Sequence, residues 1–135
     1  MTMDKTSEEW VVIRYFREKY EDFPKGRLVK SESPDFILKQ GPKKQTGIEI
    51  TRLDYLLSNH VDVDELLPAL KNIINRKEDK LRLYRKKKLN EYWLVITIDS
   101  MEATNFEHDK IIHLSLSGSL FDKVFFFDLF SGKII

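Results

Sequence analysis

The sequence contains no cysteine, so disulfide bonds and thiolate metal sites are excluded. No apolar run is long enough to cross a membrane, and residues 1–9 are polar and acidic, unlike a signal peptide. The chain has no glycine-rich phosphate-binding loop and no serine or cysteine nucleophile motif. We therefore expect a cytoplasmic protein that has no membrane partner and uses none of these common motifs.

Neither sign of charge predominates in the chain. The 23 basic and 22 acidic residues give a net charge of +1, so any surface for a polyanion must be local. Hydrophobic residues make up 41% of the 135 residues, which is enough for the core of one folded domain. We expect residues 1–135 to form a single domain.

Helix and strand signals alternate along the chain, which predicts an α/β fold with a mixed sheet. The predicted order is a helix, a meander of three strands, a long helix, a strand, a third helix and a last strand. The predicted ranges are 6–20, 27–31, 33–38, 47–53, 65–89, 91–99, 109–120 and 123–130. Thr6 or Ser7 is expected to cap the first helix.

Two strands of the meander each carry one acid inside an apolar run, Asp35 in the first and Glu49 in the second. A buried carboxylate without a partner is costly, so such acids need a reason. Residues 40–46 include the Gly-Pro pair of a turn, so the two strands can form an antiparallel hairpin. If the faces that carry the acids coincide, two carboxylates converge, as in sites for hard cations such as Mg²⁺.

The Ser-Pro-Asp segment at 33–35, followed by Gly-Ile-Glu-Ile-Thr at 47–51, resembles the core of the PD-(D/E)XK nuclease superfamily, which has the restriction-endonuclease-like fold. This family has a helix, a hairpin with the Asp and the Glu-x-Lys, a second helix and further strands. The resemblance implies a metal-dependent hydrolase of phosphodiester bonds. Asp35, Glu49 and the backbone carbonyl of Ile50 would hold Mg²⁺ or Mn²⁺.

The chain departs from this family at Thr51, where the motif has lysine. Thr51 can hydrogen-bond a metal-bound water but cannot replace an ammonium group. The helix predicted at 65–89 has Lys77 near the middle of its apolar stripe and Lys80 about one turn away. Lys77 can extend to the surface along its aliphatic stem. Alternatively, Lys77, or Lys80 as second choice, supplies the missing charge, since the catalytic lysine lies on this helix in some nucleases that the chain resembles.

Glu9 lies on the buried stripe of the first predicted helix. As a first-turn acid it stabilises the helix dipole. The resemblance offers a second role, because a first-helix acid points at the metal site in some members. Glu9 is therefore a secondary candidate that would support a second ion or a water.

A dense group of cations ends the second predicted helix and suits contact with phosphates as well as with the helix dipole. We call Arg82, Arg85, Lys86, Lys87 and Lys88 the basic helix end. The expected partner is nucleic acid, with DNA as the first expectation. The alternatives are an inactive member of the same fold that binds nucleic acid or protein, and a structural subunit whose acids pair with Lys77. Small nucleases of this fold often act as homodimers, so a homodimer is also open.

Overall fold

The computed structural model describes residues 4–53, 63–98, 113 and 116–135, and the side chains of 63–66 and 84 are not described. Its centre is a five-stranded mixed sheet in the order β1-β2-β3-β4-β5. The strands are β1 (Arg27–Lys30), β2 (Phe36–Lys39), β3 (Gln45–Arg52), β4 (Glu91–Ile98) and β5 (Lys123–Asp128). The first three form an antiparallel meander, whereas β3, β4 and β5 are mutually parallel. The predicted α/β class and mixed sheet are confirmed.

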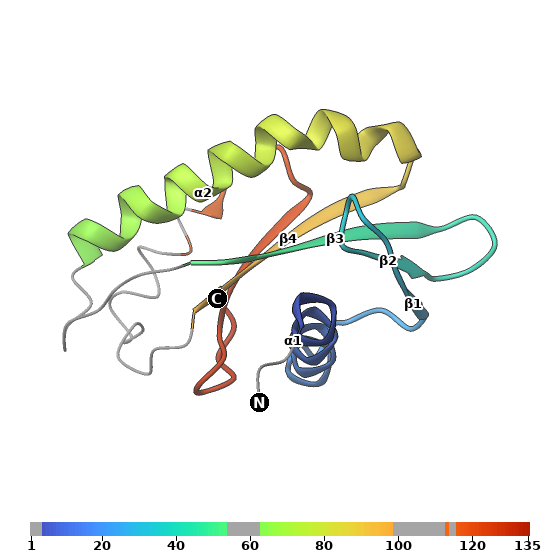
Figure 1. Ribbon diagram of the computed structural model, residues 1–135, viewed down its shortest axis with the longest axis horizontal. Helices are drawn as coiled ribbons and strands as arrows, with labels where there is room; N and C mark the ends of the chain where they lie inside the picture. The colour runs from blue at the N-terminus through green and yellow to red at the C-terminus, as the bar shows by residue number, and fades with distance from the viewer. Residues whose placement is uncertain (1–3, 54–62, 99–112, 114–115) are drawn as a thin grey trace.

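One helix covers each face of the sheet (Figure 1). The helices are α1 (Lys5–Lys19) and α2 (Val63–Tyr84), and the short 3-10 helix η1 (Arg85–Lys87) follows α2. Alternate residues of β4 face opposite helices, because successive strand side chains point to opposite faces. Trp93 and Val95 pack in the cluster with α1, and Leu94 and Ile96 pack in the cluster with α2. The prediction of a central strand covered on both faces is confirmed.

The ends of both helices differ from the prediction. Asp4, rather than Thr6 or Ser7, caps α1, because its Oδ1 accepts a 2.7 Å hydrogen bond from the Ser7 backbone N–H. The α-helical part of α2 ends at Tyr84, not near residue 89, and continues only as η1. Lys88 then has a φ of +53°, a left-handed conformation that stops a helix.

Most of the third predicted helix, residues 109–112 and 114–115, lies outside the described residues. Its described end at 117–120 is a turn rather than a helix. Gly118 lies in this turn with a φ of +79°, a value that glycine adopts readily. The predicted extension of the helix to residue 120 is therefore wrong.

The last strand ends in a turn that a buried acid holds together. Asp128 is 1% exposed, and its carboxylate accepts hydrogen bonds from the Phe130 N–H at 2.9 Å and the Ser131 hydroxyl at 3.0 Å. Asp128→Ala should lower the free energy of unfolding by about 1–3 kcal/mol, because both donors lose their acceptor. Urea denaturation would measure this loss, with exposed Asp22→Ala as the control. Equal effects of the two changes would contradict the structural role of Asp128.

Within the part of the chain that the structure describes, no helix is both long and apolar enough to span a membrane.

Candidate functional site

The pairing of β2 with β3 brings the two motif acids, Asp35 and Glu49, together at the end of the hairpin away from its turn. Phe36 is paired with Ile48, so Asp35, which directly precedes β2 rather than lying inside it, comes opposite Glu49. Pro34 packs closely on Gly47, since a β-carbon on Gly47 would lie 2.7 Å from the Pro34 Cγ. The glycine of the motif thus permits the approach that aims Asp35 at β3.

The site forms along the second half of β3, where β2 no longer pairs with it. Among the described strands, β2 pairs with β3 only over residues 45–48, and beyond them β3 pairs with β4 alone. There the Ile50 N–H donates a 2.8 Å hydrogen bond to Asp35 Oδ2. The N–H and carbonyl of one strand residue point to the same side. The Ile50 carbonyl therefore also faces the Asp35 side of β3.

The carboxyl groups of Asp35 and Glu49 interact directly and are largely buried. Glu49 is 5% exposed and the Asp35 side chain 13%. Burial, followed by a hydrogen bond with Glu49 and the Glu49 charge, raises the pKa of Asp35 to about 9. That value includes a smaller rise from a hydrogen bond with Glu9 and a reduction by the bond from the Ile50 N–H. The raised pKa of Asp35 therefore comes first from burial and then from the neighbouring Glu49 carboxylate.

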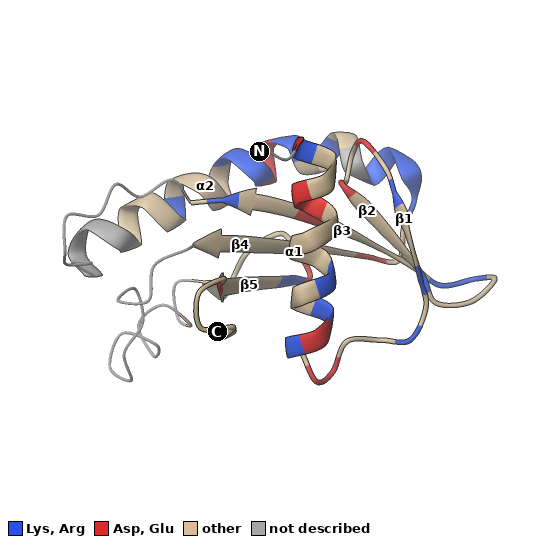
Figure 2. Ribbon diagram, turned by 60° about the horizontal axis from the view of Figure 1, so that its bottom comes forward, with Lys and Arg blue, Asp and Glu red and all other residues tan. Residues whose placement is uncertain are grey.

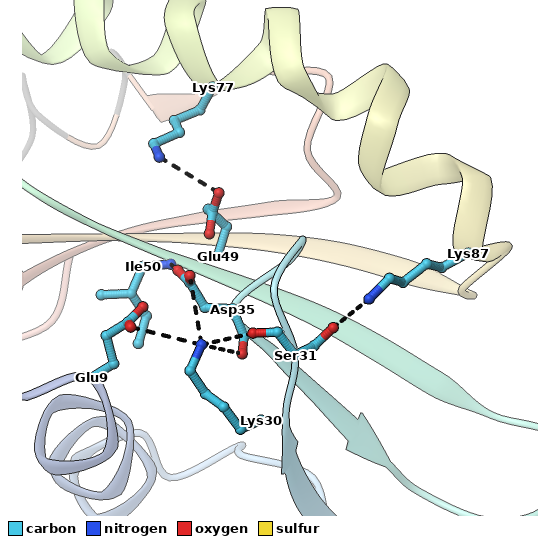
Figure 3. Close-up of polar contacts among 8 residues, drawn as sticks. All are labelled: Glu9, Lys30, Ser31, Asp35, Glu49, Ile50, Lys77 and Lys87. Atoms are coloured by element: carbon cyan, nitrogen blue, oxygen red, sulfur yellow. Dashed lines mark hydrogen bonds and ion pairs between the residues drawn. The ribbon is translucent and has the colours of Figure 1, made fainter. Parts of the chain in front are cut away.

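Lys77 reaches the acid pair from α2 (Figure 3). Its Nζ lies 3.5 Å from Glu49 Oε2, and the side chain is 22% exposed. The ammonium group thus points inward to Glu49, not away along the stem to solvent. Lys77, Asp35, Glu49 and Ile50 line one cleft of about 210 Å³.

The other two candidates on the α2 side of the sheet are Lys80 and Thr51. Lys80 is exposed and lines the same cleft. Thr51 lies on the Glu49 face of β3 and lines an adjoining hollow with Lys77 and Lys80. Thr51 is not among the residues that line the acid cleft. Its hydroxyl is therefore placed beside the site rather than in it.

Glu9 approaches the acid pair from the α1 face, where it meets a residue that sequence reasoning missed. Lys30 Nζ lies 3.7 Å from Glu9 Oε1 and 4.0 Å from Asp35 Oδ1. It also donates hydrogen bonds to the carbonyl oxygens of Ser31 at 2.7 Å and Asp35 at 3.0 Å. Lys30 is therefore a fixed cation on the α1 side of the site, and Lys77 is its counterpart on the α2 side (Figure 3).

Only a weak sequence signal marked Lys30. It lies in a short strand and shares the face of its partner Phe36, whose ring centroid is 5.1 Å from Lys30 Nζ. A lysine that alternation places on the core face of a strand needs a partner. Glu9 and Asp35 come from other parts of the chain, so the sequence alone did not identify that partner.

Lys30→Met should lower the free energy of unfolding by about 1–3 kcal/mol at pH 7.5 in EDTA, because two carbonyls and two acids lose a charged donor. Lys39→Met on β2 is the control, since Lys39 is exposed. Urea denaturation of both variants would measure the difference. An effect of Lys30→Met no larger than that of the control would mean that Lys30 does not hold the site together.

The basic helix end is exposed and lies close to the site. Figure 2 shows Lys and Arg gathered at the end of α2 that lies beside β1 and β2. Lys87 donates a hydrogen bond to the Ser31 hydroxyl, and the Ser31 carbonyl is bound by Lys30. The basic helix end therefore contacts the connection between β1 and β2, which leads into Asp35.

The donor set at the open edge fits a hard divalent cation. Two buried carboxyl groups and the Ile50 carbonyl side of β3 supply oxygen ligands, and one or two carboxylates together with substrate phosphate are common for Mg²⁺. Among the described residues, no group of three or more His, Asp or Glu side chains is placed to hold one ion. The groups that could hold one ion are Asp35, Glu49 and the Ile50 carbonyl, because Glu9 is engaged with Lys30.

Comparison of the chain with protein-family models, with curated proteins and with solved structures gives no match. The function of the site is therefore inferred from its own geometry.

Proposed function

We propose that the protein is a metal-dependent nuclease with a restriction-endonuclease-like core, which hydrolyses phosphodiester bonds in nucleic acid, with DNA as the first expected substrate. One observation carries the proposal. Asp35 and Glu49 meet beside the Ile50 carbonyl, at the part of β3 that β2 does not cover, and Lys77 lies 3.5 Å from Glu49. This arrangement corresponds to the Asp, the Glu and the missing lysine of the motif.

Asp35, Glu49 and the Ile50 carbonyl would hold Mg²⁺ or Mn²⁺. When bound, such an ion polarises a phosphate oxygen and lowers the pKa of a coordinated water. Hydrolysis adds the oxygen of one water to phosphorus and breaks one P–O ester bond, and the leaving oxygen takes up a proton. Lys77 stabilises the negative charge that grows on the phosphate oxygens. Glu9 and Lys30 hold Asp35 in position from the α1 side.

Lys30 also limits how many divalent ions the proposed site can take. It already places a positive charge between Glu9 and Asp35, where a second ion would otherwise be supported. The proposed site therefore takes one divalent ion, with Glu9 as a positioning residue.

The second candidate is a binding module of the same fold without catalysis. The observation that favours it is the neutral Thr51 in place of the motif lysine, together with a basic helix end that is exposed. The pairing of Lys77 with Glu49 would then be structural. The two candidates differ in whether bonds are broken, so cleavage decides between them.

The test is incubation of the protein with single- and double-stranded DNA and RNA oligonucleotides in Mg²⁺, Mn²⁺ or EDTA. We expect cleavage that requires the divalent ion, is lost in Glu49→Gln and is retained in Glu21→Gln, since Glu21 is exposed in a turn. An absence of cleavage of every substrate, or full activity in Glu49→Gln, would refute the nuclease. Salt-dependent binding without cleavage would support the binding module.

A further inference from the structure

A second hollow adjoins the acid cleft on the α1 side of the sheet. It has a volume of about 310 Å³ and shares Ile50 and Lys5 with the acid cleft. Glu9 also lines it, and Glu9 contacts Lys30 of the acidic site. A molecule whose charged part lies against Asp35 and Glu49 therefore has this hollow directly beside it.

The hollow is apolar inside and charged at its rim. Its apolar lining comes from Val11 and Val12 of α1, Ile50 of β3, and Leu129 after β5. Lys5 and Arg52 are the cations among its lining residues, and Glu8 and Glu9 are the acids, so the charges of the lining balance. Val11 is 53% exposed, so an apolar side chain of α1 faces solvent at this place. The part of a ligand that suits the hollow is therefore compact and apolar, and its charged part lies outside, at the adjoining acid cleft.

The volume favours a single ring system. Pockets for small organic ligands span roughly 300–1,000 Å³, and this hollow lies at the lower end of that range. A nucleotide combines a compact base, which has apolar faces, with a phosphate that can lie at the adjoining acid cleft. A base can enter such a hollow only when it has left its stack, which is easiest in a single strand.

We propose that this hollow, lined by Val11, Val12, Ile50 and Leu129, binds an unstacked base next to the phosphate held at the acid pair, so that the protein selects single-stranded nucleic acid. The proposal rests on the proposed function, because the acid pair is taken to receive the phosphate. It adds the class of substrate, which the acid pair itself does not specify. The second half of β3, which β2 does not cover, lies between the two hollows. One nucleic-acid strand can therefore pass over this edge of the sheet.

The test measures binding by fluorescence anisotropy in Mg²⁺ with the Lys77→Met variant, in which Asp35 and Glu49 can still hold the ion and the phosphate while cleavage is slow. Three labelled probes are compared: a twelve-nucleotide single strand, an all-abasic strand with the same phosphates, and a duplex of the same length. We expect the single strand to bind at least tenfold more tightly than the other two. Equal affinity for the abasic and base-containing strands would overturn the proposal, because phosphates alone would then account for binding.

Two variants in the hollow and one control variant outside it locate the effect. Val11→Glu adds a charge at an exposed position of the hollow and should remove the preference for bases. Leu120→Glu adds the same charge at a residue that is 61% exposed and lines a hollow formed with α2 instead, so it should keep the preference. Val12→Phe, which reduces the space without a change of charge, should act like Val11→Glu. Preference retained in both hollow variants, measured on folded protein, would overturn the proposal.

These results separate the two proposals. Metal-dependent cleavage without a preference for bases would leave the nuclease standing and refute the base hollow. Preference for bases that is lost in Val11→Glu, without any cleavage, would support the base hollow and refute the nuclease.

Discussion

Lys77→Met is expected to reduce the rate of metal-dependent cleavage by about 100-fold or more while the fold is kept. A charged donor that acts on the growing negative charge of a transition state typically contributes a factor of this size. Methionine replaces most of the apolar stem of Lys77, which lies on the half-buried side of α2. Because the charge is needed mainly in the transition state, kcat should fall more than KM changes. Steady-state kinetics on an oligonucleotide that the wild type cleaves would measure both.

Two other lysines of α2 make this expectation specific. Lys71→Met removes the same charge from an exposed position that lines neither the acid cleft nor the hollow at Thr51, and it should leave kcat unchanged. Lys80→Met tests the neighbour that lines the acid cleft with Lys77. Full activity in Lys77→Met with loss of activity in Lys80→Met would assign the catalytic charge to Lys80 instead of Lys77. Activity that survives both changes would refute a catalytic lysine on α2.

The free energy of unfolding should fall as pH rises from 5 to 8 in EDTA. Burial and Glu49 raise the pKa of Asp35 from 3.8 to about 9. The folded state therefore keeps a proton that the unfolded chain releases over this range, and stability is lost as pH increases. One proton gives a slope of up to about 1.4 kcal/mol per pH unit. Urea denaturation at several pH values would measure this slope.

Asp35→Asn is the variant that isolates this effect. Asparagine can still accept the bond from the Ile50 N–H and donate to Glu49, so the variant should be as stable as the wild type at pH 5 and more stable at pH 8. Exposed Asp22→Asn should keep the wild-type slope. The wild type and Asp35→Asn differ only at residue 35, so the difference between their slopes isolates the contribution of Asp35. A variant that is clearly less stable than the wild type at pH 8 would mean that Asp35 is a structural group.

The parts of the fold that sequence predicted well are those fixed by local pattern. Alternating apolar residues, with the Gly-Pro turn between them, specify the β2–β3 hairpin and its register, and the register brings Asp35 opposite Glu49. Helical periodicity placed Lys77 on the side of α2 that faces the sheet, and its ammonium group does meet Glu49. These inferences needed only the spacing of residues within one or two elements.

The parts that sequence did not predict depend on residues far apart in the chain. Lys30 belongs to the site because β1, α1 and the start of β2 converge, and no spacing in the sequence encodes that convergence. The hollow of Val11 and Leu129 likewise combines the two ends of the described chain. Asp4 was missed as a cap because Thr6 and Ser7 are equally good capping residues, and the choice between them depends on where the helix begins.

The central claim is that Asp35 and Glu49 together hold a divalent cation, and calorimetric titration with Mg²⁺ or Mn²⁺ tests it most directly. The wild-type protein should bind one ion, with a heat that disappears in Asp35→Asn and in Glu49→Gln but persists in Glu21→Gln. Chemical denaturation with and without the ion gives a second readout, because an ion that binds only the folded state must raise its stability. A wild-type protein that neither gives heat nor gains stability, or variants that bind as the wild type does, would contradict the claim.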